Sequence, residues 1–335
     1  MIGLVDRVLD RARLRRAPGR PDQVHLAVTD RCFLPCLHCD IWKNDTADID
    51  GSVWLDLIDR LGAWCAPAGM NFVGGEPLLR KDLEQLMTRA VRAGFEVSFN
   101  TNGWLVNAKR AQSISDAGVS IAYVSLDGIE AKTVDHSRGR EGSFDKAMDA
   151  INLFDALPNP RVVIAAILHA ENASEMPKLL EFVKDRGLQL VVQPLYQNFG
   201  DNAYDPLWFE TAELWPRSKG QLDAIGQAVD LLVAERLRGG AVCNQVGQLA
   251  AFKQHFQEPG VDNGYQCRAG HSDLSIDAQG NIRMCYFLDP VATVYDPTPL
   301  PLVWDGATTL RRRWEVSRCD RACNLLNCNF ERVGL

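Results

Sequence analysis

Residues 23–39 read QVHLAVTDRCFLPCLHC, a strand-like run that leads directly into three cysteines within eight residues. The β-branched and aliphatic residues of Gln23–Thr29 favour a strand. Cys32, Cys36 and Cys39 follow with the spacing Cys-x3-Cys-x2-Cys. Thiolates select soft or borderline metals, so the loop is predicted to hold zinc or an iron–sulfur cluster. A closed zinc site commonly takes four ligands, whereas three thiols suit a 4Fe–4S cluster with one open iron; spacing alone leaves both open.

Outward from this loop, strand-like runs alternate with amphipathic helical segments. The strands are predicted at Gln23–Thr29, Gly69–Val73, Glu96–Asn100, Ser120–Leu126, Arg161–Leu168 and Leu188–Pro194, and the helices at Lys81–Ala93, Asn107–Ala117, Ser143–Leu157, Ala173–Arg186 and Lys219–Arg238. This alternation indicates a parallel sheet covered by helices, either an open sheet or a partial barrel. Active sites in such folds lie at the carboxyl ends of the strands.

Polar residues follow every predicted strand at that end, which predicts one composite site. Asp127 is a candidate acid–base residue, although Asp before Gly is also an ordinary turn residue. The candidate substrate contacts at the fifth and sixth strand ends, which suit a substrate rich in hydroxyl or amino groups, are His169, Glu171, Gln193, Tyr196 and Asn198. Each of these side chains could instead satisfy local backbone groups.

Composition excludes several classes of protein. The 335 residues are 46% hydrophobic and 24% charged, as in globular proteins, and the net charge of −7 disfavours binding to nucleic acid or to an anionic membrane. Met1–Arg20 lacks the apolar core of a secretory signal, and no apolar run reaches membrane-spanning length. The expected location is the cytoplasm, where the ten cysteines stay reduced and available for metal rather than forming disulfides.

A second set of cysteines lies in irregular Gly- and Pro-rich sequence after residue 258, with a hairpin predicted at Asp277–Gly280. The expected organisation is a helical segment at 1–22, the strand–helix domain at 23–240 and the cysteine-rich extension at 241–335. The members of the second set are Cys267, Cys285, Cys319, Cys323 and Cys328. Cys65 is interpreted as a buried free thiol. Cys243 is interpreted as an inert thiol, a hydrogen-atom donor or an extra metal ligand.

The cysteine triplet after the first strand, with Gly74-Gly75-Glu76-Pro77 after the second, resembles the radical S-adenosylmethionine (SAM) superfamily. The second cysteine set resembles the SPASM/twitch extension of these enzymes, which holds auxiliary 4Fe–4S clusters. The resemblance implies an α/β fold, a partial (βα)6 TIM-like barrel with a C-terminal Cys-rich extension. A full SPASM domain has seven or more cysteines, so five imply a single auxiliary cluster, on Cys267, Cys285 and two of the last three. A structural zinc site is the alternative for this half.

The same resemblance implies a role for individual residues. Cys32, Cys36 and Cys39 would each bind one iron, with SAM chelating the fourth through its amino and carboxylate groups. The other implied SAM contacts are Gly74 and Gly75 by close backbone approach, Glu76 with the ammonium, Ser125 with the methionyl group, Asn100 or Thr101 with the ribose, Arg138 with the carboxylate and His38 with the adenine. The position of His38 is usually aromatic in the family, so this contact departs from the pattern.

The implied activity is reductive cleavage of SAM to a 5′-deoxyadenosyl radical, which abstracts hydrogen from a substrate. Only 31 residues precede Cys32, too few for the peptide-recognition domain that many peptide-modifying members carry. A small polar natural-product precursor (a sugar, aminocyclitol or nucleoside) undergoing dehydrogenation, epimerisation or rearrangement is therefore expected. A ribosomally made peptide is the close alternative. The implied partner is an electron donor such as flavodoxin or ferredoxin. A zinc-stabilised binding module without enzymatic activity is the alternative from another class.

Overall fold

The structure, a computed structural model, describes residues 19–44, 46–197, 203–261, 267–319 and 321–326. One nine-stranded sheet in the order β6-β5-β4-β3-β2-β1-β7-β8-β9 organises these residues. Its parallel strands are β1 (Gln23–Thr29), β2 (Gly69–Gly74), β3 (Glu96–Thr101), β4 (Ile121–Ser125), β5 (Arg161–Leu168) and β6 (Gln189–Pro194). Since β1 pairs with β7 rather than β6, the six strands form an open, partial barrel, as predicted.

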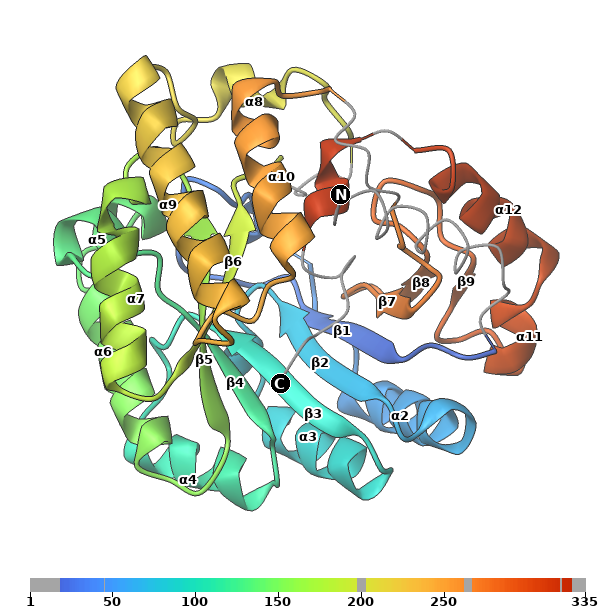
Figure 1. Cartoon of the computed structure of the whole chain (residues 1–335). Coiled ribbons are helices and arrows are strands. Elements are labelled where there is room, and N and C mark those ends of the chain that lie inside the picture. Colours follow the sequence, from blue (N-terminus) through green and yellow to red (C-terminus); the bar gives the residue numbers. More distant parts are fainter. Residues whose placement is uncertain (1–18, 45, 198–202, 262–266, 320, 327–335) are drawn as a thin grey trace.

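The extension continues the same sheet beyond β1. Its strand β7 (Asp273–Ile276) pairs parallel to β1, and β8 (Asn281–Arg283) and β9 (Ala292–Thr293) follow in antiparallel order. Together with α11 (Leu300–Trp304) and α12 (Ala307–Val316), these strands lie beside β1 at one end of the sheet (Figure 1). The two halves of the chain therefore share one sheet.

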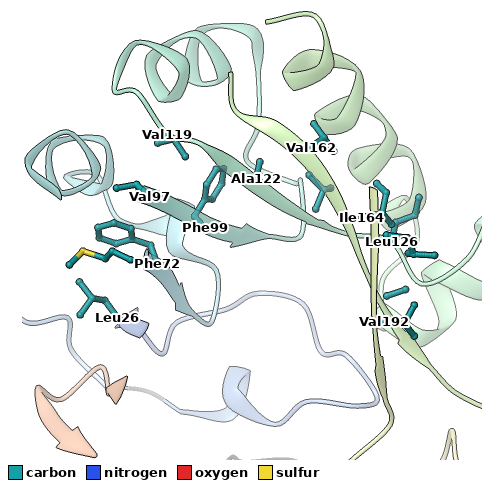
Figure 2. Packing of buried hydrophobic residues seen from close by; sticks show 14 of the residues in the cluster. Leu26, Phe72, Val97, Phe99, Val119, Ala122, Leu126, Val162, Ile164 and Val192 are labelled. Carbon is teal, nitrogen blue, oxygen red and sulfur yellow. The ribbon is translucent and has the colours of Figure 1, made fainter. Parts of the chain in front are cut away.

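Helices cover one face of the parallel strands. The helices before the extension are α2 (Gly51–Cys65), α3 (Leu83–Arg92), α4 (Ala108–Asp116), α5 (Ala131–Arg138), α6 (Ser143–Asp155), α7 (Met176–Asp185), α8 (Trp208–Thr211), α9 (Lys219–Leu237) and α10 (Val246–Gln257). Of these, α3, α6 and α7 pack directly on the strands β3 to β6. In α3 the buried residues Leu83, Leu86, Met87 and Ala90 recur at helical spacing and so form one apolar stripe. The helix face of the sheet supplies the matching residues, with Leu26, Phe72 and Phe99 from three neighbouring strands packed together (Figure 2).

The opposite face of the strands is more polar. Asn71 on β2 pairs in register with Ser98 on β3, whose Oγ donates a hydrogen bond to Asn71 Oδ1 at 3.0 Å. Asn71 Nδ2 in turn donates to Asn100 Oδ1 at 3.1 Å. Residues two apart on a strand share a face, so this ladder lies opposite Phe72 and Phe99. The apolar core therefore lies under the helices, and the other face has hydrogen-bonding groups to offer a ligand.

The sequence predictions of regular structure are confirmed for all six strands and for the helices between them, within a few residues. The hairpin at Asp277–Gly280 is also confirmed, because Asp277 N donates to Asn281 O and Gly280 N donates to Asp277 O. Helices α5, α8, α10, α11 and α12 were not predicted, and no bounds were predicted for α2. Helix α5 begins without a side-chain cap hydrogen bond and so lacks a usual start signal.

The domain boundary predicted near residue 240 stays a prediction. The residues that follow it pack directly on the elements that precede it. Helix α10 packs on α9, and Asn244 bonds both the amide and the carbonyl of Val192 on β6 at 2.8 Å. The predicted N-terminal helix lies in residues 1–18, outside the described part of the chain. No helix of the described residues is long and apolar enough to cross a membrane.

Candidate functional site

The cysteine loop follows β1 and is anchored at one end on the turn after β2. Gly75 N donates to Thr29 O at 2.8 Å, and Glu76 N donates to Arg31 O at 2.9 Å. A Cβ added at Gly74 would lie 2.1 Å from Thr29 O, and one added at Gly75 would lie 2.2 Å from Arg31 O. Gly74 also has a φ of +136°, which favours glycine. The two glycines thus admit the backbone that begins the cysteine loop.

The other end of the loop is anchored on the C-terminus of α5. Leu37 N donates to Ser137 O at 2.9 Å. Gly139 ends α5 with a φ of +68°, and a Cβ there would lie 2.3 Å from Pro35 O. Gly139 was not predicted as a site residue, although a glycine directly after a helical segment is a usual stop signal.

The three thiols of the loop lie together in a partly desolvated place. Burial raises the pKa of Cys32 to about 11 and that of Cys39 to about 12, and it also raises the pKa of Cys36. Cys36 also raises the pKa of Cys32 and of Cys39 electrostatically, and Cys32 raises that of Cys39. Desolvated thiols become stable thiolates when they bind a metal, so this donor set fits an iron–sulfur cluster. In the described part of the chain, no three His, Cys, Asp or Glu side chains surround one point as a single metal ion requires.

Glu76 lies beside this loop with its carboxylate almost fully buried. Its Oε1 accepts from Leu78 N at 3.1 Å and from Thr101 Oγ1 at 3.0 Å, and its Oε2 accepts from Asn102 N at 2.8 Å. Burial raises the pKa of Glu76 to about 7, against the effect of these donors. Two carboxylate oxygens offer about four acceptor positions, which leaves one on Oε2 for a further donor. Thr101 orients Glu76, and Asn100 is the one of the two candidate ribose contacts that lies on the polar face.

Asp127, Arg138 and His38 form a buried group behind Cys36. Arg138 Nε lies 2.7 Å from Asp127 Oδ2, and the charge of the guanidinium lowers the pKa of the Cys36 thiol, against the larger effect of burial. His38 is nearly fully buried, and burial followed by the charge of Arg138 lowers its pKa to about 3. The His38 ring is therefore neutral. Its Nδ1 has no hydrogen-bond partner among the described residues.

The predicted substrate contacts divide into exposed and enclosed residues. Gln193 at the end of β6 and Tyr196 just beyond it are partly exposed, as is Ser125, the predicted contact of the SAM methionyl group, which ends β4. His169 is fully buried, and burial lowers its pKa to about 4. Glu171 is exposed, and its Oε2 lies 2.8 Å from Nδ1 of the exposed His136. Asn198 lies outside the described residues.

Four cysteines of the second set lie together in the extension. Burial raises the pKa of Cys267 well above its ordinary value, and Cys323, Cys285 and Cys319 raise it further. Cys323 lies in η4 (Ala322–Leu325). The carbonyl of Leu325, the last residue of η4, accepts a hydrogen bond from Gln248 Nε2 at 2.9 Å. Cys328 lies outside the described residues. Four thiols are a full ligand set for one 4Fe–4S cluster.

Cys65 and Cys243 lie apart from both sets. Cys65 is fully buried at the end of α2, as its interpretation as a free thiol requires. Cys243 N donates to Leu190 O at 2.8 Å, which places Cys243 beside the second residue of β6. Leu190 precedes the end of β6 by four residues, or about 13 Å of strand. This position favours an inert thiol over a hydrogen-atom donor at the carboxyl ends of the strands.

Comparison with known proteins identifies a family for this arrangement. Residues 26–183 match the family described as the Radical SAM superfamily. Fe-coproporphyrin III synthase of Methanosarcina barkeri is 32% identical over 164 residues, covering 47% of this chain and 40% of that protein. PqqA peptide cyclase of Rhodopseudomonas palustris is 29% identical over 166 residues, covering 49% of this chain and 44% of that protein. The chain thus spans less than half the length of both relatives.

Two solved structures share the fold over most of the chain. SuiB of Streptococcus suis bound to the precursor peptide SuiA has a TM-score of 0.68 at 13% identity, covering 92% of this chain and 70% of that one. Native anSMEcpe with bound SAM and the Cp18Cys peptide has a TM-score of 0.67 at 16% identity, covering 92% and 86%. At identities of 13% and 16%, this similarity shows a shared fold alone.

Proposed function

Through residues 26–183 the chain is a member of the radical SAM superfamily, and from this premise we propose that it cleaves SAM reductively and transfers hydrogen from a substrate to the resulting radical. A 4Fe–4S cluster held by Cys32, Cys36 and Cys39 would supply the electron for cleavage of the sulfonium C5′–S bond of SAM into methionine and a 5′-deoxyadenosyl radical. That radical would take a hydrogen atom from the substrate to form 5′-deoxyadenosine. The activity is of the oxidoreductase or isomerase type. The observation that carries the proposal is the set of three adjacent, desolvated thiols anchored between the β2 turn and α5.

The proposed ligands of the SAM cluster are Cys32, Cys36 and Cys39. Glu76 is proposed to take the SAM ammonium on its remaining acceptor position, because its carboxylate is already oriented by three hydrogen bonds. Asn100 and Ser125, both on the polar face of the sheet, remain the proposed contacts of the ribose and the methionyl group. His38 remains the proposed neighbour of the adenine.

For the substrate we favour a peptide. The relatives that support this class are the PqqA peptide cyclase by its name, and SuiB and anSMEcpe by the peptides bound in their structures. The sugar, aminocyclitol or nucleoside expected from the sequence has no comparable support among them. A flavodoxin or ferredoxin remains the proposed electron donor.

The test of the proposed function is formation of 5′-deoxyadenosine by the anaerobically reconstituted chain. With SAM and dithionite, we expect 5′-deoxyadenosine above the enzyme-free control, measured by liquid chromatography and mass spectrometry. A cluster-loaded protein that forms none under any reducing condition would contradict the proposal. A short peptide encoded next to the gene for this protein, synthesised with deuterium at its C–H positions, is then added. We expect deuterium to be transferred from this peptide to 5′-deoxyadenosine. Deuterium transfer only from small metabolites of the same organism would contradict the peptide substrate but leave the proposed SAM cleavage standing.

The auxiliary cluster is proposed to bind through Cys267, Cys285, Cys319 and Cys323. We expect Cys323→Ala to lower the iron content from about eight to about four per chain, because one four-iron cluster loses a ligand. Cys328→Ala is the matched variant and should leave the iron content unchanged. Iron and sulfide analysis of both reconstituted proteins makes the measurement. Loss of iron in Cys328→Ala with retention in Cys323→Ala would assign the fourth ligand to Cys328.

A further inference from the structure

A buried ion pair connects the cysteine loop to the interior of the sheet. Arg138, the last residue of α5, is about 8% exposed. Its Nε lies 2.7 Å from Asp127 Oδ2, and its positive charge lies near enough to the Cys36 thiol to lower the pKa of that thiol. The backbone bond from Leu37 N to Ser137 O keeps the helix end and the loop adjacent. The guanidinium therefore lies between a carboxylate and one of the three thiols of the loop.

Asp127 is held in place by three elements. Its side chain is fully buried, and its Oδ1 accepts from Ile167 N on β5 at 2.9 Å. Its Oδ2 accepts from Ser137 Oγ at 3.3 Å, and its backbone carbonyl accepts from Asn172 Nδ2 at 2.6 Å. A carboxylate enclosed in this way is suited to position Arg138 rather than to exchange protons with a substrate.

Asp127 and Arg138 form a buried ion pair beside Cys36. Burial opposes ionisation of Asp127, but Arg138, together with His38, His169 and the Ile167 amide, holds the pKa of that carboxyl below its ordinary value. The positive charge beside Cys36 is therefore balanced by the Asp127 carboxylate, which lies 2.7 Å from Arg138 Nε.

We propose that the Asp127–Arg138 pair is a positioning pair that sets the reduction potential of the cluster bound by Cys32, Cys36 and Cys39. The proposal rests on the proposed function and goes beyond it. Hydrogen bonds to cluster sulfurs, and charges near them, shift the potential of an iron–sulfur cluster. Reduction adds one negative charge, which a positive neighbour stabilises and a negative neighbour destabilises, most strongly in a desolvated site. The positive charge of Arg138 beside Cys36 favours reduction of the cluster. Asp127 partly offsets that charge and holds the guanidinium in place.

The same contacts alter what the sequence predicted for the two residues. Arg138 was assigned to the SAM carboxylate and Asp127 to acid–base chemistry. With its guanidinium engaged by Asp127 and Cys36, Arg138 is placed to affect the cluster more than the affinity for SAM. Measurements of potential and of SAM binding therefore separate the two roles.

The test is a charge cycle read as the midpoint potential of the SAM-responsive electron paramagnetic resonance signal. Asp127→Asn leaves the Arg138 charge unbalanced, so we expect reduction to become at least tenfold more favourable, or 59 mV more positive for one electron. Arg138→Gln leaves the carboxylate unbalanced and should shift the potential by a similar amount to more negative values. The double variant should return close to wild type. Arg138→Lys keeps the positive charge but loses the planar guanidinium with its several N–H donors. Its midpoint potential should therefore lie between those of wild type and Arg138→Gln.

The control is Glu235→Gln, which removes one carboxylate that is paired at 2.9 Å to Arg238 at the far end of α9. Its potential should equal that of wild type. Circular dichroism establishes that each variant is folded, and iron content establishes that it has bound its clusters. If Asp127→Asn does not bind the SAM cluster, the potential of Arg138→Lys tests the proposal instead. Equal potentials in loaded Arg138→Gln, Arg138→Lys and wild type would overturn the inference. Weaker SAM binding at an unchanged potential would instead assign Arg138 to SAM. Absence of 5′-deoxyadenosine in the loaded wild type contradicts the proposed function separately.

Discussion

Replacing Cys36 with alanine is expected to reduce 5′-deoxyadenosine formation to the level of the enzyme-free control. Cys36 is the central thiol of the loop, since it interacts electrostatically with Cys32, with Cys39 and with Arg138. Without it, the cluster keeps two protein ligands, and the Arg138 guanidinium, still paired with Asp127, faces a methyl group. Assays with SAM and dithionite measure the product, and iron analysis should show loss of about four irons per chain.

The matched control for this variant is Cys65→Ala, which removes a thiol that is fully buried but belongs to neither cysteine set. We expect it to retain both clusters and its activity while losing about 1 kcal/mol of unfolding free energy to the small cavity. Cys36→Ala with wild-type product formation would show that the triplet is not the site of SAM cleavage. Equal loss of product in both variants would show that the effect is structural.

Gly75→Ala is expected to have the second largest effect, through displacement of the cysteine loop. A Cβ at this position would lie 2.2 Å from Arg31 O, closer than any packing allows, so either the β2 turn or the loop must move. The apolar core under the helices lies on the other side of the strands and should remain folded. We expect a loss of about 1–3 kcal/mol of unfolding free energy. We also expect loss of the SAM cluster with retention of the auxiliary one, as measured by iron content and by 5′-deoxyadenosine formation.

Gly226→Ala is the matched control for this substitution. Gly226 lies within α9, and a Cβ there meets nothing within 4 Å. Because alanine is favoured over glycine inside a helix, we expect a gain of about 0.5–1 kcal/mol and unchanged iron content. If Gly75→Ala kept its full iron content and activity, the close approach of the loop to the β2 turn would not be needed to form the site.

The sequence allowed much of the fold to be predicted because the strands are marked locally. Runs such as Arg161–Leu168 are continuous and aliphatic, and the predicted bounds of this strand match the structure. Helix α5 was missed because it is short, polar and without a side-chain cap. That omission mattered for the site, because α5 carries Arg138 and anchors the cysteine loop. The substrate contacts were the least predictable, since the sequence placed His169 and Glu171 together at a strand end, but one is buried and the other exposed.

What the sequence by itself determined are the features that depend on neighbours along the chain: the alternation of strands and helices, the cysteine spacing after β1 and the glycines after β2. Only the tertiary structure decided which distant residues meet. Pairing of the strands brings Asp127, at the end of β4, and Arg138 onto the loop that follows β1. Pairing of β1 with β7 joins the cysteine-rich extension to the barrel. The physical reason is that periodicity encodes which face of an element is buried. The contacts of a charged or thiol side chain depend on elements that come together only when the sheet forms.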